Sequence, residues 1–373
     1  MKAKNTFLCL IILSIVLVAF NGCAKKDASV IKIGAILPLT GDLASYGQNS
    51  KNAIELAVLE IQEKSGPDIE MIFEDDKGLT KDAVTAFQKL LNIDNISAVI
   101  GPLQSGSVLA IAPTANQKEI VVISPGSTSP EITDAGEFIF RNCPSDDYEG
   151  KEAAKFVFNK LKKQKAAILY INNDYGAALE KVFKLEYEKL GGKIVGSESF
   201  VQNETDFRSR LIKIQAALPQ VVYIIALNES IQIARQMEEL KIDAQILGSI
   251  MMNNQDVISK TRGALDGAIV AGWQFSLANP DEKAEKFISK FRSKYGNEPD
   301  VFAAQSYDAV YLLSQAIEQV PSPFSTTELQ KQLLNVKLDG VTGYTQFDKN
   351  GDVVKSINFE IIEGDSLVPY SGN

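Results

Sequence analysis

Two short segments rich in glycine and hydroxyl-bearing residues follow apolar stretches that have the pattern of buried strands. The stretch 98–100 runs into GPLQSGS, and the stretch 120–123 runs into SPGST. In parallel sheets, ligands bind beyond the carboxyl ends of strands, where free backbone N–H groups and helix N-termini meet. Hydroxyl and N–H donors together form an anion site, so Ser105 and Thr128 are candidates to bind a carboxylate. The alternative is that both residues only cap helices.

Alternating strand and helix patterns predict how these segments are positioned. The first half of the chain has strand patterns at 31–37, 69–73, 98–100 and 120–123, and helix patterns around 53–61, 80–91 and 107–116. The second half has strand patterns at 166–171, 193–195, 221–225, 245–247 and 268–270, and helix patterns at 148–161, 176–190, 206–216 and 230–240. Helical patterns within 281–295, 301–320 and 327–334, and two strands around 348–352, complete the chain. Such units predict an α/β fold with two doubly wound, mostly parallel lobes.

Composition narrows the class of function. The chain has 373 residues, is 45% hydrophobic and carries a formal charge of −9, so a nucleic-acid backbone is not an expected partner. It contains no histidine, which removes the Ser/His/Asp and Cys/His nucleophile systems and the commonest zinc ligand. Neither a GxGxxG nor a GK[ST] motif is present, so no nucleotide or other cofactor is expected. The chain is therefore not expected to be an enzyme.

The N-terminus has the pattern of an export signal. Residues 1–22 place lysines ahead of an unbroken apolar run that ends at Phe20, and Cys23 follows. This resembles a bacterial lipoprotein signal, in which the cysteine is acylated, although Phe20 and Asn21 depart from the preferred residues. The alternative is a plain secretory signal. Cys143 then has no partner for an internal disulfide and is expected to be a small buried hydrophobe.

Two other features have ordinary structural interpretations. The sequence DKNGD at 348–352 opens like a calcium loop, but Val353 and Phe359 stand where glycine and glutamate are needed. It is therefore interpreted as a hairpin turn on Asn350-Gly351. Trp273, the only tryptophan, could face a cleft, and a place in the core is the better interpretation.

Tyr46 and Tyr175 have matching contexts, since each precedes a glycine in a loop that follows a strand. One would lie in each lobe, where the ring could pack on an apolar ligand and the hydroxyl could reach a polar group. The alternative is that either tyrosine is an incidental part of a surface turn. Asn228 and Ile250, which follow two strands of the second lobe, complete the candidate ligand-binding set.

Several segments, in order, resemble one family. They are IGAILPLTG at 33–41 with Tyr46-Gly47, Gly101-Pro102 with Ser105, ISPGST at 123–128, Asp174-Tyr175-Gly176, Tyr307-Asp308-Ala309 and FDKNGD at 347–352. They are similar to segments of the leucine/isoleucine/valine-type substrate-binding proteins of bacterial ABC transporters. The similarity covers nearly all of the chain after the signal. It implies the type I periplasmic binding protein fold, in which three crossing strands join two lobes that close like a hinge.

The resemblance also implies roles for single residues. Ser105 and Thr128 would supply hydroxyl and N–H groups to a ligand carboxylate, with Ser127 in the same loop. The carbonyl of Gly126 would accept from an ammonium group. Tyr46 and Tyr175 would close over the rest of the ligand.

The domain boundaries and partners follow from the same resemblance. Lobe 1 would comprise 30–143 and 276–347, and lobe 2 would comprise 144–275 and 348–370, with hinges near 142–144, 273–276 and 345–348. The protein would be an exported, lipid-anchored monomer on the periplasmic or extracellular face that delivers its ligand to a permease. A sensor domain of the same fold is the alternative function.

The identity of the ligand stays open at this point. Amino-acid binders of the family place an acidic residue for the ammonium group where this chain has Ile250. Burying an ammonium group without an acid costs several kcal/mol. Either another acid replaces it, with Glu229 as the nearest candidate, or the ligand is a carboxylate without an amine. Glu229 is more readily interpreted as a solvated residue in the first turn of a helix.

Overall fold

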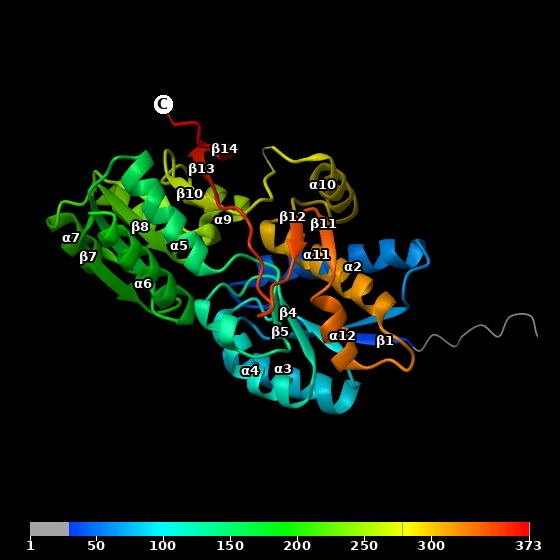
Figure 1. Ribbon diagram of the computed structural model, residues 1–373. Helices are drawn as coiled ribbons and strands as arrows, with labels where there is room; N and C mark the ends of the chain where they lie inside the picture. The colour runs from blue at the N-terminus through cyan, green and yellow to red at the C-terminus, as the bar shows by residue number, and fades with distance from the viewer. Residues whose placement is uncertain (1–29, 278, 373) are drawn as a thin grey trace, which may run out of the picture.

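The computed structural model describes residues 30–277 and 279–372, so the export signal and the expected lipidation of Cys23 lie outside the described residues. The described chain forms two α/β lobes, which lie side by side in Figure 1. The blue, cyan and orange segments belong to the first lobe, and the green segments with the red strands β13 and β14 belong to the second. This confirms the predicted fold class.

The first lobe is built on a parallel sheet with the order β2-β1-β3-β4-β5. Its strands are β1 (Ile31–Leu37), β2 (Ile69–Asp75), β3 (Ala98–Ile100), β4 (Val121–Ser124) and β5 (Ile139–Arg141). The helices α2 (Ala44–Glu63), α3 (Thr80–Lys89) and α4 (Ser105–Gln117) connect them. β3 and β4 are neighbours and run parallel, so the loops after them meet at one edge of the sheet.

The second lobe repeats this strand order and extends it at one side. Its sheet has the order β14-β13-β10-β9-β8-β6-β7, in which β13 runs antiparallel to both of its neighbours, β10 and β14. The strands are β6 (Lys165–Ile171), β7 (Lys193–Phe200), β8 (Val221–Ile225), β9 (Gln245–Gly248), β10 (Ile269–Gly272), β13 (Asn358–Glu363) and β14 (Ser366–Pro369). The helices are α5 (Asp146–Lys155), α6 (Asp174–Lys189), α7 (Arg208–Ala216), α8 (Ser230–Glu239) and α9 (Gln255–Thr261).

Between these elements the described chain passes from one lobe to the other three times. The first passage joins β5 to α5, and the second joins β10 to α10 (Glu282–Tyr295). α10, α11 (Val301–Gln319), α12 (Thr326–Leu333) and the hairpin of β11 (Lys337–Gly340) and β12 (Gly343–Gln346) belong to the first lobe, where α11 packs on α2. The third passage leads from this hairpin to β13.

The turn at 348–352 corrects one sequence interpretation. It is a turn held by Asp348, whose carboxylate accepts from the N–H groups of Asn350 (2.8 Å) and Asp352 (3.0 Å). The strands on either side do not pair with each other, because β12 pairs with β11 and β13 pairs with β10 and β14. The predicted hairpin on Asn350-Gly351 is therefore wrong.

The same turn moves the start of the third passage. Arg141 N–H donates to the Gly351 carbonyl (3.0 Å), so the turn lies against β5 in the first lobe. The segment 348–352, expected at the start of lobe 2, thus packs on lobe 1, and the chain leaves that lobe only after it. The passage consists of residues 353–357.

Two interpretations of single residues are confirmed. Trp273 is buried in the core, and so is Cys143. Burial raises the pKa of the Cys143 thiol to about 12, so this thiol is unreactive at neutral pH. Across 30–277 and 279–372, no helix is both long and apolar enough to span a membrane, and no cluster of acidic or cysteine side chains is arranged to hold a metal ion.

Candidate functional site

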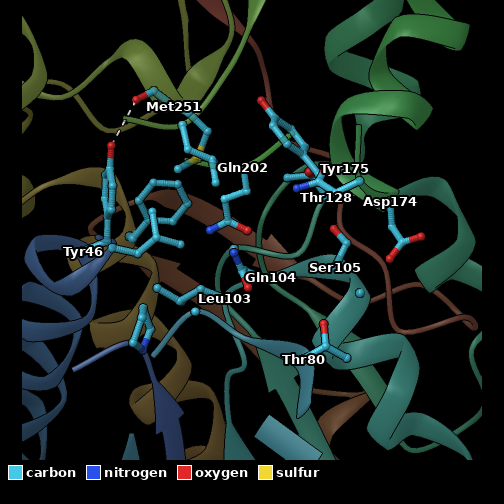
Figure 2. A pocket seen from close by; sticks show the side chains of 18 of the residues that line it. Tyr46, Thr80, Leu103, Gln104, Ser105, Thr128, Asp174, Tyr175, Gln202 and Met251 are labelled. Carbon is cyan, nitrogen blue, oxygen red and sulfur yellow. Dashed lines mark hydrogen bonds between the residues drawn. The ribbon is translucent and has the colours of Figure 1, made fainter. Parts of the chain in front are cut away.

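A cavity of about 220 Å³ lies between the lobes at the carboxyl ends of their parallel strands (Figure 2). Residues from both lobes line it. From the first lobe these are Pro38, Leu43, Tyr46, Gly78, Leu79, Thr80, Leu103, Gln104, Ser105, Gly106, Gly126, Thr128 and Phe302, and from the second they are Asn173, Asp174, Tyr175, Gln202, Leu227, Ile250 and Met251. Six of the eight predicted ligand-binding residues are among them.

One end of the cavity is a cluster of hydrogen-bond donors. Ser105 is the first residue of α4, and its hydroxyl oxygen accepts from Ser129 N–H (3.2 Å), which leaves the hydroxyl proton available. Within the described residues, the N–H groups of Ser105, Gly106 and Thr128 have no acceptor. Because a helix N-terminus also carries partial positive charge, this end of the cavity suits an anion.

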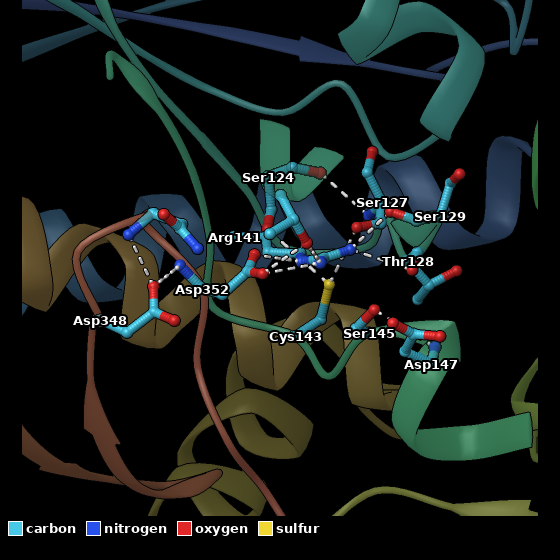
Figure 3. Close-up of polar contacts among 12 residues, drawn as sticks. Ser124, Ser127, Thr128, Ser129, Arg141, Cys143, Ser145, Asp147, Asp348 and Asp352 are labelled. Atoms are coloured by element: carbon cyan, nitrogen blue, oxygen red, sulfur yellow. Dashed lines mark hydrogen bonds and ion pairs between the residues drawn. The ribbon is translucent and has the colours of Figure 1, made fainter. Parts of the chain in front are cut away.

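Arg141 fixes the loop that carries Thr128 (Figure 3). Its side chain is fully buried and donates to the carbonyls of Thr128 (2.9 Å) and Ser129 (2.7 Å). Its other N–H groups bind Asp352, with N···O distances of 2.6 and 3.0 Å, and the Thr133 hydroxyl (2.8 Å). These hydrogen bonds hold the Thr128 carbonyl in the protein interior and so fix the position of Thr128 in the cavity wall.

Gly126 lies where the wall is tightest. A Cβ atom at this position would lie 3.1 Å from the Leu103 carbonyl oxygen and 3.1 Å from the Phe302 ring. Such distances are shorter than ordinary van der Waals contact. Glycine therefore allows the backbone to approach a ligand closely at this point.

The two tyrosines come from opposite lobes, as their contexts indicated. The Tyr46 hydroxyl donates across the cleft to the Met251 carbonyl (3.3 Å), a contact drawn as a dashed line in Figure 2. Tyr175 is nearly buried at the start of α6, and its hydroxyl lies beside Ser249. Asn228 makes a second contact across the cleft, because its amide donates to the Asp42 carbonyl.

Two predicted site residues do not line the cavity. Ser127 is fully buried behind it, and its hydroxyl lies 3.3 Å from each of the carbonyl oxygens of Pro102 and Leu103. Asn228 lies at the rim, where it joins the lobes. Both residues are close in sequence to residues that line the cavity. Neighbouring residues of a tight loop point in different directions, so closeness in sequence did not predict where these two side chains lie.

The apolar part of the wall has members that the sequence analysis missed. Phe302, on α11, packs edge-on against Tyr46 and Trp273, with 5.5 Å between ring centroids in each case. Leu103, Leu227 and Met251 also line the cavity. Phe302 could not be found from the strand-end pattern because it comes from a helix that the chain adds to the first lobe from its C-terminal part.

Ile250 lines the cavity, and Glu229 does not replace the missing acid there. The acid that does line the cavity is Asp174, from the second lobe, and it lies beside Gly106. The Glu229 carboxylate accepts from Asn203 N–H (2.9 Å) and Leu227 N–H (3.2 Å), so it joins its own loop to the loop after β7. Its side chain is buried, so the interpretation as a solvated residue is wrong as well.

Two other acids lie behind the wall, on the first turn of α5. Burial and the neighbouring Glu149 charge raise the pKa of Asp146 well above its ordinary value, while the Thr128 hydroxyl and Arg141 oppose the shift. Burial raises the pKa of Glu149 to about 7, although Ile250 N–H, Tyr223 and Trp273 stabilise its charged form.

Comparison with known proteins gives consistent results. A family model described as periplasmic binding protein matches residues 30–359. The Leu/Ile/Val-binding protein BraC3 of Rhizobium johnstonii is 29% identical over 342 residues, which cover 90% of this chain and 91% of that protein. The structure of the leucine-binding protein LivK from Thermotoga maritima superposes with a TM-score of 0.85 at 27% identity, covering 92% of this chain and 98% of that one. The branched-chain amino acid transporter substrate-binding protein LivJ from Streptococcus pneumoniae, in complex with isoleucine, gives a TM-score of 0.84 at 28% identity, covering 91% and 98%.

Proposed function

Because the chain belongs to the periplasmic binding protein family, whose members bind solutes and are not enzymes, we propose that it captures a small carboxylate between its lobes and delivers it to an ABC transporter permease. The observation that carries this proposal is the anion site at one end of an otherwise largely apolar cavity between two lobes. A ligand bound there would touch both lobes and so would favour the closed arrangement.

The lining residues fit a ligand that has a charged end and an apolar end. Ser105 would bind the carboxylate through its hydroxyl and N–H groups and Thr128 would bind it through its N–H group, and the Gly126 carbonyl is available to a ligand donor. Tyr46, Tyr175 and Phe302 would enclose the apolar part. A cavity of about 150 Å³ holds benzene, so about 220 Å³ suits an acid with a short aliphatic or aromatic side chain. The ligand names of BraC3, LivK and LivJ are compatible with this size.

A ligand panel tests the proposal. Leucine, isoleucine, valine and phenylalanine, each beside its 2-keto and 2-hydroxy analogue, should include compounds that raise the melting temperature. Ser105→Ala should weaken the best compound by about 1.5–3 kcal/mol, or roughly 10- to 150-fold, as expected for a hydrogen bond to a charged group. Ser107→Ala is the matched control, because Ser107 is buried in the same helix outside the cavity. Binding of no carboxylate, or equal effects of the two variants, would contradict the proposal.

The anchor is a separate part of the proposed function. The sequence around Cys23 supports acylation of this residue, which would hold the protein at the cell envelope near its permease. Wild-type protein should then need detergent for release from membranes, whereas Cys23→Ala should be released without it. Wild-type protein that is free of the membrane without detergent would rule out the anchor and leave the binding function untouched.

A further inference from the structure

Asp146 and Glu149 lie directly behind the polar end of the cavity. Asp146 N–H donates to the Thr128 carbonyl (2.8 Å), and the Thr128 hydroxyl interacts with the Asp146 carboxylate. Both acids also act on Tyr175, which lines the cavity from the second lobe. The two carboxylates therefore lie where Thr128 and Tyr175, one from each lobe, come together.

These carboxylates are buried without full compensation. Asp146 is 0% exposed and Glu149 is 1% exposed. Among the described residues, neither Asp146 oxygen has a well-aligned hydrogen-bond partner, and only one Glu149 oxygen has them, Ile250 N–H (3.2 Å) and the Tyr223 hydroxyl (3.3 Å). Buried carboxylates normally have a counter-ion, because an isolated buried charge is strongly unfavourable.

The protein itself supplies little positive charge at this place. Arg141 acts on Asp146, but its guanidinium group is already paired with Asp352. The other charged side chains that act on Asp146 are Glu149 and Asp147, and both are acids. Two acids and one committed arginine make ionisation of the acids unfavourable in the unliganded protein, and a cation bound in the cavity would favour their charged forms. Buried acids without a matching counter-charge beside a cavity are typical of a functional site.

A ligand amine would supply the missing charge. In an α-amino acid the ammonium group and the carboxylate share one carbon, so a carboxylate on Ser105 and the α4 N-terminus leaves the ammonium group near Gly126 and Thr128. If the Thr128 hydroxyl donates its proton to Asp146, the lone pairs of its oxygen can accept a hydrogen bond from the ligand ammonium group. Attraction between opposite charges in a desolvated site extends over several ångströms, so direct contact with Asp146 is not required.

We infer that Asp146, with Glu149 behind it, is the counter-charge for the α-ammonium group of the ligand, and that the ligand is a zwitterionic amino acid. This inference rests on the proposed function and decides between the two ligand classes that the sequence left open. It places the acid on the first turn of α5 instead of at position 250 or 229. Asp146 then determines specificity, because it favours an amine over a keto or hydroxyl group at the same carbon.

The test compares the affinities of leucine and phenylalanine with those of their 2-keto analogues. Wild-type protein should bind one of the amino acids at least tenfold more tightly than its keto acid. Asp146→Asn should lose roughly 10- to 100-fold for the amino acid and little or nothing for the keto acid, as for loss of the attraction between opposite charges several ångströms apart in a partly desolvated site. Asp147→Asn is the matched control, because it removes the same charge from the neighbouring, exposed position and should change neither affinity.

Protein stability separates a binding role from a structural one. Unliganded Asp146→Asn should melt at the wild-type temperature or above it, because a buried charge is removed. If this variant fails to fold, Glu149→Gln gives the same comparison. A wild type that binds the keto acids as tightly as the amino acids, or variants in which the ratio is unchanged, would overturn the inference while the proposed function stands. A wild type that binds neither class would overturn both.

Discussion

Glu149 shows how a single buried acid makes the stability of this protein depend on pH. Its pKa is 4.5 in an unfolded chain and about 7 in the fold. Below pH 4.5 the group is protonated in both states and contributes no difference. Between pH 4.5 and 7 the folded state binds more protons than the unfolded one, so the free energy of unfolding falls as pH rises. Above pH 7 the full penalty applies, on the order of 3 kcal/mol.

Glu149→Gln should therefore stabilise the unliganded protein by up to roughly 3 kcal/mol at pH 8 and by much less at pH 4.5. Glutamine keeps an acceptor for Ile250 N–H and for the Tyr223 hydroxyl. Urea unfolding at the two pH values measures the difference. Glu152→Gln, on the partly exposed side of the same helix, is the control and should not stabilise the protein in this way at pH 8. If Glu149→Gln changed the free energy of unfolding equally at both pH values, the raised pKa of Glu149 would not be the cause.

At the residue scale, the sequence predicted the residues of the anion site but not the buried acids behind it. Ser105 and Thr128 were found because the carboxyl ends of neighbouring parallel strands share one edge of a sheet. Asp146 and Glu149 could not be found in this way. Acids in the first turn of a helix are usually solvated and favoured there by the helix dipole, and nothing in the local sequence tells that this turn faces the interior.

At the scale of elements, one buried network ties two of the passages between the lobes to α11. Asn142, in the first passage, donates to the Gln305 backbone carbonyl (2.7 Å) and to its side-chain oxygen (3.0 Å). Lys355, in the third passage, donates to the same Gln305 oxygen (3.2 Å) and to the Thr342 hydroxyl (2.6 Å). Asp308 provides the negative charge and accepts from Thr342 N–H (2.9 Å). The two passages are thus anchored to the first lobe at one place.

Lys355→Met should lower the free energy of unfolding by about 3–5 kcal/mol at pH 7, because Asp308 would remain buried without its counter-charge. Burial already lowers the pKa of Lys355 to about 8 and raises that of Asp308. Adding Asp308→Asn should recover part of the loss, since no buried charge is then left unpaired. Urea unfolding of the single and double variants measures both effects. The exposed Lys349→Met is the control, and a Lys355→Met protein as stable as the wild type would contradict the argument.

The sequence predicted the elements of the two sheets well, and it failed where pairing is decided at long range. β3 and β8 begin and end as their apolar runs indicated. The hairpin of β11 and β12 was missed, and the strand after 352 was paired wrongly. β13 joins β10, which lies some ninety residues earlier in the chain, and no local pattern encodes that partner. The helices of the C-terminal part were predicted, but nothing in the local sequence indicates that α11 brings Phe302 into the cavity wall.

At the scale of the whole molecule, the lobes are in contact across the cleft. Tyr46 reaches Met251, Asn228 reaches Asp42, and Gly106 of the first lobe faces Asp174 of the second. These contacts come from loops and from the first turns of α2, α4 and α6, whereas each lobe has its own sheet. Few groups would therefore have to separate if the passages act as hinges, and the lobes would be free to open in the absence of ligand.

A disulfide across the cleft would report on this opening. A Cβ atom on Gly106 would lie 3.6 Å from the Asp174 Cγ atom, so cysteines at both positions have sulfur atoms within bonding reach when the lobes are closed. In protein expressed from Ala24, the remaining cysteine, Cys143, is buried with a thiol pKa of about 12 and should not interfere. If ligand binding shifts the population toward the closed state, mild oxidation of Gly106→Cys/Asp174→Cys should form the bridge several times faster with a bound amino acid than without it. Electrophoresis without reducing agent measures the rate, and each single variant, first checked for ligand binding, is the control. Equal rates with and without ligand, in a double variant that still binds it, would mean that closure does not depend on the ligand.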